Sequence, residues 1–214
     1  MAIDIKDINY IIDTYKGLKY KKNKDIDIFY GTLSINHIYN DVHINEVFDI
    51  TIQINNDYPK SIPSIIETSG KIRTSYPHCF ANKRLCLATE LEQRICLEEK
   101  GISGWIEDFV IPYFFSYEYY KRYSVYPFGE RSHGLKGILE SYKELFKIED
   151  KIDVYSVFEY AINHKYRGHD KCPCGSGKKV RNCHGELIQN IIHSKFYGLI
   201  IEDFKIYENR KEKI

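Results

Sequence analysis

Residues 42–54 alternate between apolar and polar side chains, most regularly in the stretch Phe48-Asp49-Ile50-Thr51-Ile52-Gln53-Ile54. Alternation with a period of two is typical of a β-strand that buries one face and exposes the other. Turn-forming residues such as Asn40-Asp41 and Asn55-Asn56-Asp57 bound this run, and further strands are expected at 27–36, 64–68 and 71–74. The sequence therefore predicts a four-stranded antiparallel meander, which limits the fold to classes that contain one.

Helical periodicity occurs on both sides of the predicted strands. Apolar residues recur every three or four positions from Ile5 to Tyr15, which predicts an amphipathic helix over residues 4–17. The basic and polar residues 19–24 are expected to break the chain before the first strand. Further helices are expected at 104–123, 135–146, 154–164 and 186–207, with Pro112 breaking or kinking the first of them. A helix, a meander and then more helices make an α+β fold.

The composition argues against several classes of protein. The chain has 214 residues and a formal net charge of +1, so no overall field favours a nucleic acid partner or an acidic membrane. The N-terminus carries charges where a signal peptide needs apolar residues, and no apolar run of about 18 residues occurs. We therefore expect a cytoplasmic protein whose six cysteines serve metal binding or catalysis and do not form disulfides.

The charged segment 147–153 lacks apolar periodicity, and we place a domain boundary there. This boundary divides the chain into a first domain of residues 1–150 and a helical appendage of residues 151–214.

A cysteine-rich segment lies in the appendage, where eight residues separate Cys172 and Cys174 from the adjacent pair Cys183 and His184. Three thiolates and one imidazole are a ligand set that zinc accepts in tetrahedral geometry. Residues 172–185 closely resemble the SEC-C zinc motif, known from the C-terminus of the bacterial secretion ATPase. The alternative is a set of loose thiols in a flexible tail. Lysines and arginines also make the segment locally basic, which fits an acidic protein partner or a surface that is merely solvated.

A second resemblance covers the region after the central strand. That strand leads to Tyr58-Pro59 with Pro63 four residues on, then to Tyr76-Pro77-His78, and eight residues after His78 comes Cys86 between two leucines. This order resembles the core of ubiquitin-conjugating enzymes, in which a Tyr-Pro-x-x-x-Pro turn precedes a His-Pro-Asn tripeptide and a nucleophilic cysteine. The first and third residues of the tripeptide differ here. The resemblance implies a helix followed by a four-stranded meander, and it makes Cys86 a candidate carrier of an acyl group.

Thioester chemistry needs an accessible cysteine and a hydrogen-bond donor for the oxyanion. In the family, the asparagine of the tripeptide is associated with that oxyanion or with the shape of the loop. His78 stands in its place, where it could donate a hydrogen bond and titrate near neutral pH. The alternative is that His78 only orders the loop.

Cys96 is the rival nucleophile, because it too lies between Ile95 and Leu97. It is eighteen residues past His78, and the surrounding pattern fits a short helix in which Cys96 faces the core. We therefore favour Cys86, and we expect Cys79 to be a loop or core residue.

The long stretch 88–104, the segment 128–134 and the SEC-C motif together resemble a bacterial branch of the conjugating fold, encoded in anti-phage operons beside a cyclic-oligonucleotide synthase. That resemblance implies a thioester with the C-terminal residue of the synthase, which is then passed to a lysine. His133 or Glu130 could assist the incoming amine as a base, although either could simply pin a turn. The alternatives are a non-catalytic binding module of the conjugating fold and an adaptor built around the zinc motif.

Overall fold

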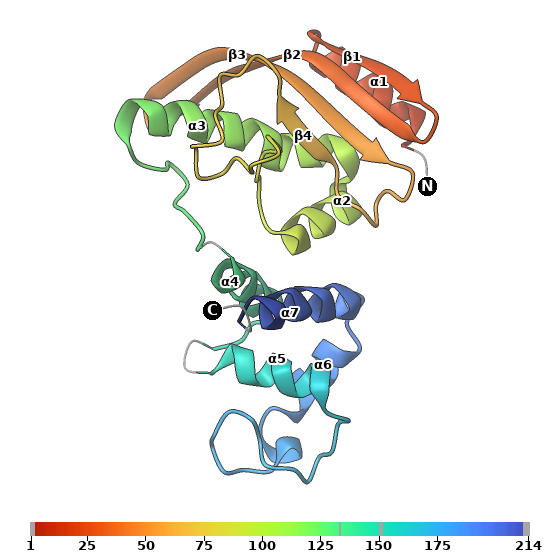
Figure 1. The fold of residues 1–214 in the computed structure, drawn as a ribbon, viewed down its shortest axis with the longest axis vertical. Helices are drawn as coiled ribbons and strands as arrows, with labels where there is room; N and C mark the ends of the chain where they lie inside the picture. Colours follow the sequence, from red (N-terminus) through yellow and green to blue (C-terminus); the bar gives the residue numbers. More distant parts are fainter. Residues whose placement is uncertain (1–2, 133, 150–151, 212–214) are drawn as a thin grey trace. The chain divides into compact units, whose positions relative to one another are not determined.

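A computed structural model describes residues 3–132, 134–149 and 152–211, with side chains up to residue 205. The chain forms two compact units, Met1–Glu130 and Arg131–Ile214. The first unit contains α1 (Ile5–Thr14), β1 (Leu18–Asn23), β2 (Ile26–Tyr39), β3 (Val42–Asn55), β4 (Ser64–Glu67), α2 (Glu90–Trp105), a π-helical turn (Ile106–Val110) and α3 (Ile111–Tyr123) (Figure 1). The second contains α4 (Leu135–Leu145), α5 (Val154–Asn163), a short 3-10 turn (Val180–Asn182), α6 (Gly185–Ile192) and α7 (Tyr197–Lys211).

The four strands form one antiparallel meander in the order β1-β2-β3-β4, which confirms the α+β class and three of the four predicted strands. In β3 the side chains of Phe48, Ile50, Ile52 and Ile54 are buried, whereas Asp49 and Gln53 between them are exposed. The alternation in the sequence therefore marks the two faces of the sheet.

The buried face of the sheet packs against the helices that follow it, with α3 against β2 and β3 (Figure 1). The rings of Phe48 in β3 and Phe114 in α3 lie 4.5 Å apart, and Trp105 at the end of α2 is fully buried. The indole N–H of Trp105 donates to the side-chain oxygen of Gln93 at 2.9 Å, which satisfies the polar atom of a large core residue.

Two strand predictions were wrong. Residues 19–24 were expected to be a break, but most of them lie in β1. Since β1 is at the edge of the sheet and only its Leu18 is buried, the strand has no apolar alternation to reveal it. Residues 71–74 were expected to be a strand but form a loop, because the buried carboxylate of Glu67 accepts hydrogen bonds from the backbone N–H groups of Ser69 and Ile72 and turns the chain after β4.

The helices also differ from prediction in detail. Pro112 does not break a helix; it lies in the first turn of α3, where a missing N–H is tolerated, and the π-helical turn joins α3 to α2. The helix expected at 186–207 is two helices. The break comes where the hydroxyl of Ser194 accepts a hydrogen bond from the backbone N–H of Phe196 at 3.1 Å, in the turn that precedes α7.

The second unit is built on its own aromatic core. The ring of Tyr142 in α4 lies 5.4 Å from that of Phe158 in α5, which lies 5.7 Å from Phe204 in α7. The hydroxyl of Tyr142 also donates to Asp203 at 2.6 Å. These contacts place α4 in the second unit, so the units divide at Glu130/Arg131 and not at the charged segment near residue 150. Among the described residues, none of the helices is both long and apolar enough to cross a membrane.

Candidate functional site

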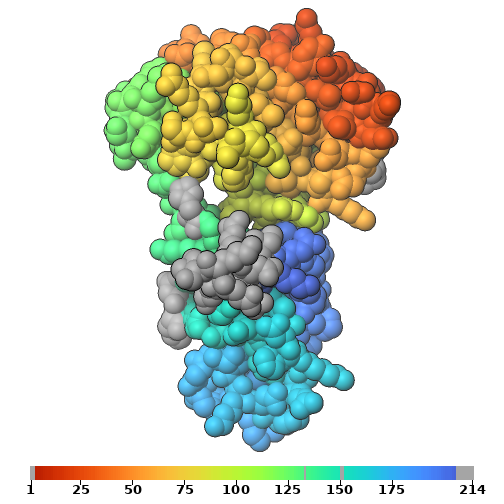
Figure 2. Space-filling view, in the orientation of Figure 1, coloured from red at the N-terminus to blue at the C-terminus, as the bar shows by residue number. Residues whose placement is uncertain are grey.

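The segment that contains Cys86 is fixed beside the edge of the sheet. Arg84 forms a bridge with Ile66 of β4, and the backbone N–H of Leu85 donates to the carbonyl of Ile65 at 2.9 Å. Cys79 forms a second bridge with Leu85, so the chain from 79 to 85 folds back on itself. In the space-filling view this part of the chain, in yellow, lies on the surface of the first unit (Figure 2).

The carbonyl oxygen of His78 links this segment to α3. It accepts a hydrogen bond from the backbone N–H of Cys86 at 2.8 Å and another from the hydroxyl of Tyr113 at 3.0 Å. The spacing of eight residues thus brings His78 and Cys86 together through their backbones, and a long-range contact from α3 holds the same atom.

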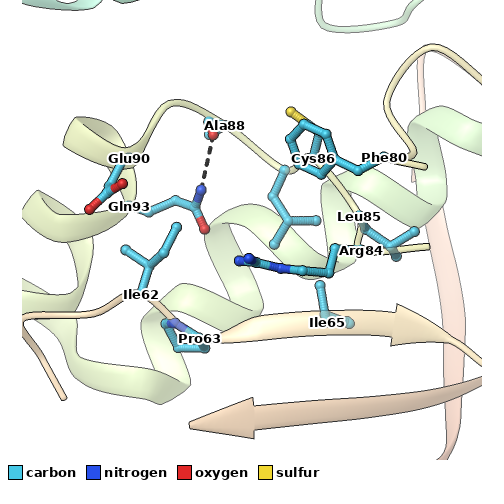
Figure 3. A pocket seen from close by; sticks show the side chains of 11 residues that line it. Ile62, Pro63, Ile65, Phe80, Arg84, Leu85, Cys86, Ala88, Glu90 and Gln93 are labelled. Carbon is cyan, nitrogen blue, oxygen red and sulfur yellow. Dashed lines mark hydrogen bonds between the residues drawn. The ribbon is translucent and has the colours of Figure 1, made fainter. Parts of the chain in front are cut away.

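The thiol of Cys86 is half-buried. Its sulfur is directed away from Pro63 and Ile65, toward the rim of a pocket (Figure 3). Burial raises the pKa of the Cys86 thiol, because removal from water penalises the thiolate. At neutral pH the resting group is therefore a protonated thiol, which needs a base before it can act as a nucleophile.

The imidazole of His78 contacts aromatic rings and a carboxylate. Its ring lies 5.7 Å from the ring of Tyr76 and 5.3 Å from that of Tyr126, and Nε2 lies 3.3 Å from Oε1 of Glu130. Two residues that the sequence analysis considered separately, His78 and Glu130, therefore form one pair. His133, the third candidate, lies outside the described residues.

Cys96 faces the core, as expected if the residues around it form a short helix. It lies in α2 with 6% of its surface exposed, and its sulfur is 3.6 Å from a carboxylate oxygen of Asp108. Burial, together with this carboxylate, raises the pKa of Cys96 to about 11. Cys79 is buried as well, and burial raises its pKa. Of the three cysteines in the first unit, Cys86 is the most accessible.

A pocket of about 230 Å³ opens beside Cys86. Of the lining residues only Cys86 is a candidate from the sequence, because the lining combines segments that are distant in the chain. Its walls come from the segment before β4, from the segment that carries Cys86 and from the first turn of α2, and the lining residues are Ile62, Pro63, Ile65, Phe80, Arg84, Leu85, Cys86, Leu87, Ala88, Glu90 and Gln93 (Figure 3).

The second unit contains a cluster of four possible metal ligands, Cys172, Cys174, Cys183 and His184, whose ligand atoms all lie within 4.8 Å of one another. The sulfurs of Cys174 and Cys183 are 3.6 Å apart, and Nδ1 of His184 is 3.3 Å from the sulfur of Cys172 and 3.4 Å from that of Cys183. Tetrahedral geometry with bonds of about 2.3 Å to sulfur and about 2.0 Å to nitrogen separates sulfurs by about 3.8 Å and sulfur from nitrogen by about 3.5 Å. The four residues could therefore hold one metal ion.

The loop around the cluster is shaped by its own backbone. Gly175 and Gly177 have φ angles of 77° and 74°, which other residues rarely adopt. The backbone N–H of Cys172 donates to the carbonyl of Lys178 at 2.9 Å, which closes the loop. The hydroxyl oxygen of Ser176 lies 3.2 Å from the sulfur of Cys174 and 3.3 Å from that of Cys183. Two of the four candidate ligands thus share a polar neighbour that the sequence analysis did not single out.

Comparison with known proteins found no matching family model. The chain is 44% identical over 52 residues to the protein translocase subunit SecA of Ehrlichia ruminantium (strain Welgevonden), which is 24% of this chain and 5% of that protein. It is 64% identical over 28 residues to the same subunit of Ehrlichia canis (strain Jake), 13% of this chain and 3% of that protein. The chain thus spans only a small part of the length of the curated relatives that it matches. These matches agree with the SEC-C resemblance and concern a short segment only.

Proposed function

We propose that the protein is a thioester-forming conjugation enzyme of the ubiquitin-conjugating type, in which Cys86 carries the C-terminus of a partner protein. The observation that carries the proposal is the fixed position of Cys86. It is a half-buried thiol on a surface segment, tied through its own N–H to the carbonyl of His78. The helix and four-stranded meander before it follow the order expected of that fold. The partner proposed from the sequence is a cyclic-oligonucleotide synthase in anti-phage defence.

The proposed reaction has two steps. The thiol loses its proton, its sulfur attacks the activated carbonyl carbon of the partner's C-terminus, and the activating group leaves as a thioester forms. An amine then attacks the thioester, an amide bond forms, and the Cys86 thiolate departs and regains a proton. Since burial raises the pKa of Cys86, a base must assist the first step. We propose the His78–Glu130 pair for this role, because Glu130 stabilises the protonated imidazole.

We also propose that the cluster of Cys172, Cys174, Cys183 and His184 holds zinc. Three sulfurs and one nitrogen match the ligands of structural zinc sites, and the three separations given above are within a few tenths of an ångström of tetrahedral geometry. Zinc there would fix the loop between α5 and α6 and take no part in acyl transfer.

The test is co-expression with the candidate partner and a search for an adduct that a reducing thiol releases. Cys86→Ser should convert it to a stable ester, and Cys86→Ala should abolish it. Cys96→Ala is the matched control, because Cys96 has a similar neighbourhood in the sequence but is buried. Full conjugation by Cys86→Ala, with loss in Cys96→Ala, would refute the assignment.

A binding module without catalysis is the second candidate, because burial raises the pKa of Cys86 and Tyr76-Pro77-His78 departs from the tripeptide of the family. In that case neither cysteine substitution changes the behaviour of the protein, and its interaction with the partner persists in Cys86→Ala. An adaptor role for the metal-binding loop predicts instead that this interaction is lost when Cys183 is replaced.

A further inference from the structure

The pocket beside Cys86 combines apolar walls with one cation, Arg84. Ile65 and Leu85 are almost fully buried at its base. Glu90, the acidic residue of the lining, is already paired with Arg94 at 2.5 Å. Arg84 extends across the pocket toward the end where Gln93 lies, and within the described part of the chain no carboxylate forms an ion pair with it (Figure 3). The pocket thus has an unmatched positive charge above an apolar surface.

The size of the pocket limits what it can bind. About 230 Å³ is below the range of roughly 300 to 1,000 Å³ that cofactors and drug-sized ligands occupy. One or two amino-acid side chains fit better. Arg84 and Cys86 both line the pocket, so a group bound at Arg84 shares this cavity with an acyl group on Cys86.

We infer that this pocket binds the tail of the acyl donor and selects a tail that has an apolar side chain and a carboxylate next to its C-terminal residue. This inference rests on the proposed function of Cys86. The apolar side chain covers Pro63 and Ile65, and the carboxylate pairs with the guanidinium of Arg84. A guanidinium is suited to this role because its planar donors match the two oxygens of a carboxylate.

The experiment uses the full chain and two acetylated tripeptide thioesters. Both peptides contain an apolar residue and end in glycine. The remaining residue is glutamate in one peptide and glutamine in the other. We expect transfer to Cys86 to be about fivefold faster from the glutamate peptide, the scale of one partly exposed ion pair. Arg84→Gln should remove this preference. Lys83→Gln, a change of charge at the neighbouring exposed residue outside the pocket, should preserve it. Equal rates from both peptides, or a preference that survives Arg84→Gln, would overturn the inference.

A second measurement separates failure of the pocket from failure of the proposed function. The full chain is alkylated with N-phenylmaleimide or with its 4-carboxy derivative, and the rate at Cys86 is followed by mass spectrometry of the peptide that contains it. The carboxylated reagent should react severalfold faster, and the advantage should disappear in Arg84→Gln but not in Lys83→Gln. If Cys86 accepts neither thioester but shows this Arg84-dependent difference, the proposed function fails and the pocket stands. Equal alkylation by both reagents refutes the pocket.

Discussion

Replacement of Tyr113 by phenylalanine tests how the Cys86 segment is held in place. The hydroxyl of Tyr113 donates to the carbonyl of His78, which also accepts from the N–H of Cys86. Burial raises the pKa of Tyr113 far above its ordinary value, so the hydroxyl keeps its proton and remains a donor at any pH that the protein meets. The substitution removes one hydrogen bond and little else, because the ring remains.

The expected loss of stability depends on the second hydrogen bond that the carbonyl of His78 accepts. Since the N–H of Cys86 still satisfies that oxygen, no buried acceptor is orphaned, and the expected loss is about 1 kcal/mol in the free energy of unfolding. For a unit of 130 residues this corresponds to a decrease of about 3–5 °C in Tm. Part of the loss should be local, so the N–H of Cys86 should exchange with solvent up to about fivefold faster.

Thermal unfolding and hydrogen exchange of the peptide that contains Cys86 measure the two effects. Tyr117→Phe is the matched control, because Tyr117 also lies in α3 and its hydroxyl donates to a loop carbonyl, that of Lys71, at 2.7 Å. It should leave the exchange of Cys86 unchanged. If Tyr113→Phe leaves both stability and exchange unchanged, the hydroxyl does not hold the segment. If Tyr117→Phe accelerates Cys86 exchange equally, the effect is not specific to the His78 carbonyl.

Three further predictions concern the thiol, the metal cluster and a helix terminus. Because burial disfavours the thiolate of Cys86, its alkylation by iodoacetamide should have a pH midpoint above the ordinary value of a thiol, and a midpoint near neutrality would contradict the described environment. The purified protein should contain about one equivalent of zinc, and Cys183→Ala should abolish zinc binding. Chelation should increase hydrogen exchange in residues 172–185 without affecting β2 and β3. A substoichiometric metal content in unaltered protein would refute the zinc site. Ser194→Ala should destabilise the second unit by about 1 kcal/mol in chemical denaturation, whereas an unchanged midpoint would show that the hydroxyl does not stabilise the turn before α7.

β3 was predictable because it is buried on one face only. In β3, and in residues 32–36 of β2, the apolar residues alternate with polar ones, and the pattern depends on nothing outside the strand. β1 has the same backbone geometry but pairs on one side and buries only Leu18, so its polar sequence indicates a loop. The break between α6 and α7 depends on Ser194, a single hydroxyl inside an otherwise helical pattern. Periodicity therefore identifies elements that contribute a face to the core and misses edges and interruptions.

The candidate site likewise combines a spacing that is local in the sequence with contacts between residues that are distant in the sequence. The spacing of His78 and Cys86 is local, and the carbonyl of His78 meets the N–H of Cys86 because the chain between them folds back through the bridge of Cys79 with Leu85. The donor from Tyr113 and the carboxylate of Glu130 come from 35 and 52 residues farther along the chain than His78, and only the packing of α3 and the segment after it brings them near.

These distant partners determine what the site can do chemically. The backbone bond alone positions Cys86 but leaves a thiol whose pKa is raised by burial, and such a thiol is a poor nucleophile. In the proposed reaction the proton of that thiol goes to the imidazole of His78, which lies 3.3 Å from Glu130. Arg84 lines the same pocket as Cys86. The spacing of the motif therefore predicts where the candidate thiol lies. The proposed activation and choice of donor also involve Glu130 and Arg84, which the motif does not contain.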